Sequence, residues 1–157
     1  DNFWKIYTNM ENQPPQYVAP GAKLKQSIVS EGCEIYGEVY SSVIGPDVTV
    51  EEGAVIRDSI IMENVVIKKD AVLDRCIIDR NTVIGEGAVL GMGENIPNEK
   101  KPNIYNTGIT VAGENTVVPP GVKIGKNCVI FGKTEPEDYP DGEAASGKTV
   151  IREGVLI

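Results

Sequence analysis

Aliphatic residues recur in this chain with a period of seventeen residues, and this period limits the possible folds more than any other feature. Between residues 50 and 90 the most hydrophobic positions are separated by steps of six, six and five residues. These positions form three columns: Val50, Ile67 and Ile84; Ile56, Leu73 and Leu90; Ile44, Ile61 and Ile78. An α-helix requires steps of three and four residues, and a flat strand requires alternation, so neither explains the period. A triangular β-solenoid with three short strands per coil does explain it.

The residues at the expected corners of the coils support this interpretation. Three positions after the aliphatic residues of the six-residue steps stand residues that tolerate a left-handed backbone: Asp47, Gly53, Asn64, Asp70, Asn81 and Gly87. The five-residue step carries Ser42, Ser59 and Cys76 instead, so we expect that corner to be built differently. Ile-Gly pairs at 44–45, 84–85 and 124–125 are typical of the hexapeptide repeat and predict a left-handed solenoid, although parallel crossovers are usually right-handed.

The period divides the chain into three parts. Residues 1–17 lack the period and are predicted to form an extended linker. Residues 18–131 carry it and predict an all-β, single-stranded left-handed parallel β-helix of roughly six coils. Residues 132–157 are predicted to form a C-terminal loop and a capping strand. The period is interrupted over residues 91–109, and a loop of this length within a compact repeat is usually functional or part of an interface.

Composition restricts the partners and the compartment. A net charge of -8 argues against nucleic acid, whose phosphate backbone would be repelled. No apolar run approaches the roughly 18 residues of a membrane span, and no signal peptide opens the chain. Three widely spaced cysteines, Cys33, Cys76 and Cys128, are expected to be reduced, buried core residues of a cytoplasmic protein. The first methionine is Met10, so we expect the chain to be a segment of a longer polypeptide.

The chain contains no histidine, which restricts its chemistry. Hexapeptide acyltransferases typically use a histidine base, and solenoid carbonic anhydrases bind zinc through histidines, so both classes are disfavoured. We expect no catalytic residues, no metal site and no cofactor in this domain. Two alternatives stay open at this point: a free-standing scaffold solenoid, and a fragment of a hexapeptide acyltransferase.

Several segments resemble, in order along nearly the whole chain, the C-terminal domain of bacterial glucose-1-phosphate adenylyltransferases, the ADP-glucose pyrophosphorylases of glycogen synthesis. These segments are Trp4–Thr8, Pro14–Val18, Ser27–Cys33, Gly37–Val39, Asp58–Met62 and Cys76–Arg80. The resemblance implies that an N-terminal catalytic domain, missing from this chain, precedes the linker of residues 1–17. That domain would join ATP and glucose 1-phosphate into ADP-glucose and pyrophosphate with Mg²⁺.

The resemblance also implies the partners of this domain. They are its own N-terminal catalytic domain, the other subunits of a homotetramer or heterotetramer, and a phosphorylated small-molecule effector. The domain itself would have a regulatory and oligomerisation role. A noncatalytic regulatory subunit of the same enzyme is a close alternative.

One effector-binding residue can be carried over from the family. Arg80 matches an arginine that in relatives helps bind a phosphorylated activator or a nucleotide inhibitor, and a guanidinium suits phosphate through paired, charge-assisted hydrogen bonds. The alternative is a surface ion pair with Glu63, which lies seventeen residues earlier. Relatives carry further arginines in the final strand, where this chain has Val111–Glu114. Lys100 and Lys101 are weaker candidates to supply that charge, or they belong to a solvated loop.

Overall fold

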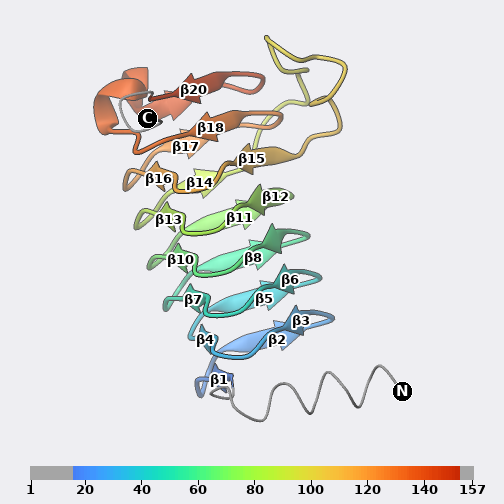
Figure 1. The fold of residues 1–157 in the computed structure, drawn as a ribbon, viewed down its shortest axis with the longest axis vertical. Helices are drawn as coiled ribbons and strands as arrows, with labels where there is room; N and C mark the ends of the chain where they lie inside the picture. Colours follow the sequence, from blue (N-terminus) through green and yellow to red (C-terminus); the bar gives the residue numbers. More distant parts are fainter. Residues whose placement is uncertain (1–15, 153–157) are drawn as a thin grey trace.

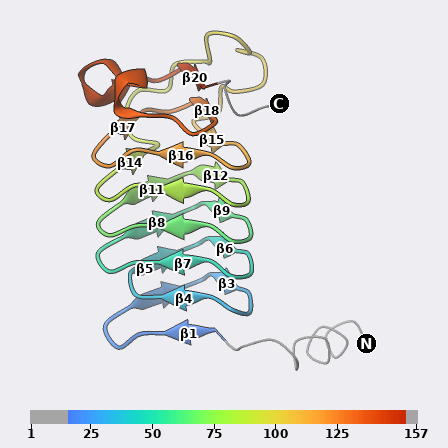
Figure 2. The same ribbon diagram turned by 60° about the vertical axis from the view of Figure 1, so that its left-hand side comes forward.

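The computed structural model describes residues 16–152, which form a triangular prism of short parallel strands (Figure 1). The chain visits three sheets in turn, so strands three apart in order pair with one another along most of the stack. This confirms the predicted left-handed parallel β-helix. Figure 2 shows the coils from another side, with β4 and β7 of one sheet stacked directly on each other.

The three sheets are named A, B and C here, and their strands are given from the N-terminal end of the stack. Sheet A contains β1 (Tyr17–Val18), β4 (Glu34–Ile35), β7 (Thr49–Val50), β10 (Val66–Ile67), β13 (Val83–Ile84) and β16 (Val117–Val118). Sheet B contains β2 (Lys23–Lys25), β5 (Glu38–Tyr40), β8 (Val55–Arg57), β11 (Val72–Asp74), β14 (Val89–Leu90), β17 (Lys123–Ile124) and β19 (Glu143–Ala144). Sheet C contains β3 (Ile28–Val29), β6 (Val43–Ile44), β9 (Ile60–Ile61), β12 (Cys76–Ile78), β15 (Thr110–Ala112), β18 (Val129–Phe131) and β20 (Thr149–Ile151). Two short 3₁₀ turns, η1 (Pro136–Asp138) and η2 (Pro140–Gly142), precede β19.

The predicted aliphatic columns form the core. Ile67 lies between Val50 and Ile84 in sheet A, at the seventeen-residue register expected from the sequence. The residues of all three columns are at most 1% exposed. Because side chains alternate between the two faces of a strand, the neighbours of these residues point outward. The prism is therefore filled by aliphatic side chains, and its outer surface is free to vary.

One coil near the N-terminal end of the stack is shorter than the others. Lys23 lies opposite Glu38 and Ile28 opposite Val43, which is an offset of fifteen residues. Gly37 makes this tightening possible, because a Cβ atom there would overlap the carbonyl oxygen of Ala54 in the next coil. The two buried residues on either side of Gly37, Ile35 and Val39, are accordingly only four residues apart.

The corners have the two constructions that the sequence predicts. The six corner residues from Asp47 to Gly87 all have positive φ, between 54° and 81°. At the corner between sheets B and C, hydroxyl groups form a ladder inside the turn. The backbone N–H of Ser59 donates to Ser42 Oγ at 3.1 Å, and the N–H of Cys76 donates to Ser59 Oγ at 3.0 Å. The five-residue step is stabilised by these buried side-chain bonds.

Two expectations about the extent of the stack need correction. Sheets B and C contain seven strands each, so the structure has more than the roughly six coils expected. The stack also continues beyond residue 131, because β19 pairs with β17 and β20 pairs with β18. Period counting missed this last coil because η1 and η2 replace its sheet A strand. The predicted linker, residues 1–17, lies almost entirely outside the described residues.

Candidate functional site

Arg80 lies at the corner where the chain passes from sheet C to sheet A, directly after β12. Its backbone is held on both sides: its N–H donates to Asp79 Oδ1 at 2.7 Å, and its carbonyl accepts from the N–H of Asn115 at 3.0 Å. Asn81, with φ of 58°, completes the turn. The Arg80 side chain is 54% exposed. The corner therefore presents a charged group on a fixed backbone.

Two carboxylates from the coils on either side contact this guanidinium. Glu114 Oε2 lies 3.1 Å from Arg80 Nε, and Glu63 Oε1 lies 4.0 Å from Nη1. The predicted pair with Glu63 is confirmed. Glu114 was not identified as a partner from the sequence, because the interruption at 91–109 hides that this residue stacks on the coil containing Arg80. The aliphatic period that resumes after residue 109 could have shown that Glu114 stacks on this coil.

The contacts of Arg80 allow another anion to replace a carboxylate at its guanidinium. Exposed ion pairs of this kind contribute about 0 to 1 kcal/mol each. A phosphate group that accepts two charge-assisted hydrogen bonds from the guanidinium can therefore replace Glu114 at low cost. The same carboxylates, together with Asp79, weaken the positive potential at the corner, so an anion is favoured only if it makes direct contacts. The geometry at Arg80 therefore suits an anion that makes direct contacts with the guanidinium.

The inserted loop, residues 91–109, leaves the stack after β14 and returns at β15, at the corner between sheets B and C. It is attached to the last coils by two buried asparagines. Asn98 Nδ2 donates to the carbonyl of Asn127 at 2.9 Å, and Asn127 Nδ2 donates to that of Ile96 at 2.8 Å. Glu99 accepts from the N–H of Thr149 at 2.9 Å. The loop is therefore an ordered part of the prism.

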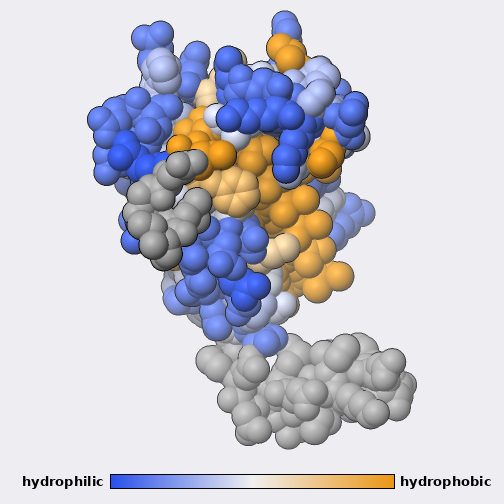
Figure 3. Space-filling view, turned by 45° about the horizontal axis from the view of Figure 1, so that its top comes forward, coloured by the Kyte–Doolittle hydropathy of each residue, from blue (hydrophilic) through white to orange (hydrophobic). Residues whose placement is uncertain are grey.

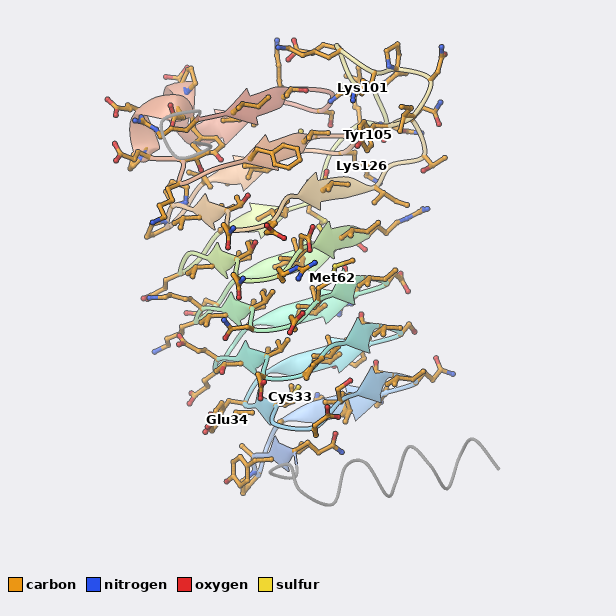
Figure 4. All side chains as sticks on the ribbon, viewed as in Figure 1. Cys33, Glu34, Met62, Lys101, Tyr105 and Lys126 are labelled. Atoms are coloured by element: carbon orange, nitrogen blue, oxygen red, sulfur yellow. The ribbon has the colours of Figure 1, made fainter. Side chains whose placement is uncertain are left out.

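Lys100 and Lys101 lie on this loop, and their backbone N–H groups both donate to Asn98 Oδ1. Both residues are exposed, and Figure 4 shows Lys101, Tyr105 and Lys126 on one side of the prism, toward the C-terminal end of the stack. Arg80 occupies a different edge of the prism, between sheets C and A. The structure does not bring the two lysines to the site of Arg80.

A groove that the sequence did not reveal lies where the loop meets sheet B. It has a volume of about 380 Å³ and is lined by Met92, Ile96, Lys123 and Ser146, among others. Ser146 Oγ already accepts the N–H of Lys126 at 3.0 Å. No sequence motif marks this groove, because it exists only through the folding of the loop onto the last coil.

The three cysteines are free and buried, as expected. Burial raises the pKa of the Cys76 thiol to about 12, and burial also raises the pKa values of Cys33 and Cys128. A thiolate is the reactive form of cysteine, so these side chains are unreactive core residues at neutral pH. Over residues 16–152, no cluster of three metal-ligating side chains occurs. In the same part of the chain, no helix has the length and hydrophobicity needed to cross a bilayer.

Comparisons with known proteins agree with the fold and with the resemblance. Residues 17–112 match the family described as GlmU-like, C-terminal hexapeptide. A glucose-1-phosphate adenylyltransferase of Acetivibrio thermocellus is 47% identical over 98% of this chain, and one of Lachnospira eligens is 54% identical over 98%. The chain spans about 36% of the length of these two relatives. The resemblance to this group of proteins is thereby confirmed.

A solved structure shares the fold. The acetyltransferase domain of PglB from Neisseria gonorrhoeae aligns with a TM-score of 0.53 over 98% of this chain and 58% of that domain. The two sequences are 17% identical. This likeness concerns the β-helix alone.

Proposed function

The chain belongs to the GlmU-like, C-terminal hexapeptide family, and on this premise we propose that it is the regulatory and oligomerisation domain of a glucose-1-phosphate adenylyltransferase. The identity of about half the residues over nearly the whole chain with such enzymes carries this proposal. The reaction, formation of ADP-glucose and pyrophosphate from ATP and glucose 1-phosphate, takes place in an upstream domain. ATP and Mg²⁺ bind there. Described residues of this chain offer neither a histidine nor a cluster of metal ligands.

Regulation is assigned to the corner at Arg80. Its guanidinium is exposed and contacts only exposed carboxylates among the described residues, so a phosphorylated effector can compete for it. Loss of a hydrogen bond to a charged group costs about 1.5 to 3 kcal/mol, which corresponds to roughly a tenfold to 150-fold loss of affinity. Removal of Glu114, the closer competitor, acts in the opposite direction by up to about fivefold.

The test uses the complete polypeptide, including its upstream sequence, and measures pyrophosphate release from ATP and glucose 1-phosphate. Inorganic phosphate, a sugar bisphosphate and AMP serve as effector probes. Arg80→Ala is expected to shift the half-effect concentration of the responding probe at least tenfold and to leave turnover without effector unchanged. Glu114→Gln is expected to lower that concentration.

Arg57→Ala is the matched control, since Arg57 is also on the surface but belongs to sheet B, where it packs 5.2 Å from the ring centre of Tyr40. Absence of pyrophosphate release with every probe would reject the enzyme assignment. Equal loss of basal and effector-dependent rates in Arg80→Ala would reject only the role of Arg80. A response to Arg57→Ala as large as that to Arg80→Ala would have the same consequence.

A further inference from the structure

The C-terminal end of the prism carries backbone donors that in the earlier coils are used for pairing. In each sheet a backbone N–H donates to a carbonyl of the following coil, and among the described residues no coil follows β19 and β20. Such an edge is a template for another strand, and repeat proteins need caps at their ends for this reason. Figure 3 shows hydrophilic residues gathered at this end, with hydrophobic residues between them. The partners of the last donors therefore show how the stack is closed.

In sheet C the donors at the first outward position pair in the same way from coil to coil. Their N–H groups donate to carbonyls of the following coil at 2.9 to 3.1 Å: Ile28 to Ser42, Val43 to Ser59, Val111 to Cys128 and Val129 to Lys148. Thr149 is next in this column, opposite Val129. Its N–H donates at 2.9 Å to a carboxylate oxygen of Glu99, on the inserted loop. The carboxylate thus takes the position of the carbonyl of a following coil.

The inserted loop is fixed where Glu99 can reach this donor. The N–H of Glu99 donates to the carbonyl of Gly147 at 2.8 Å, directly before the last strand of sheet C. Asn98 Nδ2 donates to Thr149 Oγ1 at 3.1 Å. The backbone and the neighbouring side chain therefore hold the carboxylate of Glu99 on the edge of β20.

Sheet A ends in a similar way with a different carboxylate. The donors directly after its buried column pair with the following coil at 2.8 to 3.0 Å: Tyr36 to Val50, Glu51 to Ile67, Lys68 to Ile84 and Gly85 to Val118. Pro119, the next residue in this register, has no N–H. Glu135 follows it, because the bridge between Val117 and Lys133 continues the sheet by one coil. The N–H of Glu135 donates at 2.8 Å to Asp138 Oδ2, a bond that also belongs to the capping box of η1.

The two carboxylates, which we call the edge caps, have similar surroundings. Lys148 lies directly before β20, with its Nζ 3.6 Å from Glu99, and Arg152 lies directly after β20, with its Nε 2.8 Å from Asp138. The hydrogen bond from Thr149 lowers the pKa of Glu99, and the bond from Arg152 lowers that of Asp138. Both groups are therefore ionised at neutral pH, and an ionised acceptor forms a stronger hydrogen bond than a carbonyl.

The two caps come from opposite sides of the end of the stack. Figure 1 shows the inserted loop on one side of β20 and the two 3₁₀ turns on the other. In sheet B, no described carboxylate accepts from the backbone of β19. A further coil would have to pair with all three sheets, because the chain passes through each in turn. Closure of two edges is therefore sufficient to end the stack.

We propose that Glu99 and Asp138 terminate the β-helix: each carboxylate replaces the carbonyl of a following coil and prevents the edge of another chain from adding to the prism. The inserted loop, residues 91–109, then has a role of its own, since it supplies the cap of sheet C. Neither cap depends on the proposed enzymatic activity. The pyrophosphate assay and the tests of the caps can therefore fail separately.

Residue-resolved hydrogen exchange of the complete polypeptide tests each cap directly. Glu99→Ala is expected to accelerate exchange of the Thr149 N–H by roughly tenfold or more, because a hydrogen bond to a charged acceptor is lost. Asp138→Ala is expected to do the same at Glu135. Glu99→Gln is expected to keep most of the protection at Thr149, since its amide oxygen can accept the same bond. Protection of the central coils verifies that each variant is folded.

Two glutamates supply matched controls. Glu94 lies on the same loop as Glu99, and Glu137 contacts Arg152 at 2.7 Å, as Asp138 does at 2.8 Å. Among the described residues neither control side chain accepts a backbone N–H. Glu94→Ala and Glu137→Ala are therefore expected to leave the exchange of the edge donors unchanged.

Sedimentation velocity of the complete polypeptide tests the consequence for association. The double variant Glu99→Ala/Asp138→Ala is expected to form additional larger species whose share rises with protein concentration. Glu99→Gln/Asp138→Asn is expected to keep the size distribution of the unsubstituted protein, because both acceptor oxygens remain.

Three results would overturn the proposal. The first is unchanged exchange at Thr149 and Glu135 in the alanine variants. The second is an unchanged size distribution of the double alanine variant. The third is an equal effect of Glu94→Ala or Glu137→Ala, since loss of charge and not loss of the acceptor would then explain the change.

Discussion

Replacement of Ile67 by alanine tests the register on which the whole prism depends. Ile67 is 0% exposed and packs between Val50 and Ile84 of the neighbouring coils. The substitution removes three carbon atoms, which lowers the transfer free energy by roughly 2.4 kcal/mol at about 0.8 kcal/mol per group. The cavity adds a further cost, because stacked coils are held by backbone hydrogen bonds and cannot close in. We therefore expect a loss of about 3 to 4 kcal/mol, within the roughly 2 to 5 kcal/mol typical of such changes.

The adjacent residue supplies the matched control. Val66 belongs to the same strand and pairs with the same coils, but its side chain points outward and is half-buried. Val66→Ala is expected to cost less than about 1 kcal/mol, and Ile67→Val about 0.5 to 1.5 kcal/mol.

The assay is urea denaturation followed by far-UV circular dichroism, with the free energy of unfolding obtained from midpoint and slope. The variants can be compared only if the dependence of the unfolding free energy on urea concentration has the same slope in each, because the coils of a β-solenoid can unfold separately. Equal losses in Val66→Ala and Ile67→Ala would refute the assignment of inward and outward positions. A larger loss in Val66→Ala would show that the register is shifted by one residue.

Three further predictions concern the loop, the last coil and the thiols. Asn98→Ala removes buried hydrogen bonds to Asn127 and to the loop backbone, so hydrogen exchange of residues 95–108 is expected to accelerate at least tenfold while the central coils stay protected. Arg152 hydrogen-bonds the Asp138 carboxylate and lowers its pKa below its ordinary 3.8. We therefore expect the unsubstituted chain to be more stable than Arg152→Met above about pH 4. This difference in stability is lost as the pH falls further and the carboxyl is protonated. Equal stability of the two chains at pH 7 would contradict this role. Because the pKa of the Cys76 thiol is about 12, iodoacetamide at pH 8 is expected to leave it unmodified in the folded chain and to modify it in urea; rapid labelling of the folded chain would contradict its burial.

Much of the fold could be predicted because most coils repeat the same pattern of buried and corner residues. The columns through Ile67, Leu73 and Ile78, the left-handed corner residues and the different construction at Ser59 all follow from a period that is visible in the chain. At the end of the stack, the segment predicted as a loop contains two 3₁₀ turns and the short strand β19, and a strand, β20, is present where a capping strand was predicted. Tyr139, between these turns, is buried in the same hydrophobic cluster as the columns, although no periodic signal marks it.

The candidate site could be predicted only in part. The seventeen-residue register places Glu63 beside Arg80, and this pair is present. Glu114 lies closer still, but the nineteen residues of the inserted loop separate it from the regular count. Lys100 and Lys101 were weaker candidates for added positive charge, and the loop holds them at another corner.

The sequence by itself determined the prism, because in a solenoid each coil contacts only its neighbours and the seventeen-residue period therefore specifies the register of the central strand pairs. Only the tertiary structure decided where the inserted loop packs and which carboxylates surround Arg80. Glu114 lies 34 residues after Arg80, which is two periods, and it is the partner in the next coil only because the inserted loop leaves the stack between them. The core is thus encoded locally, whereas the site proposed for an effector exists only after the coils have stacked.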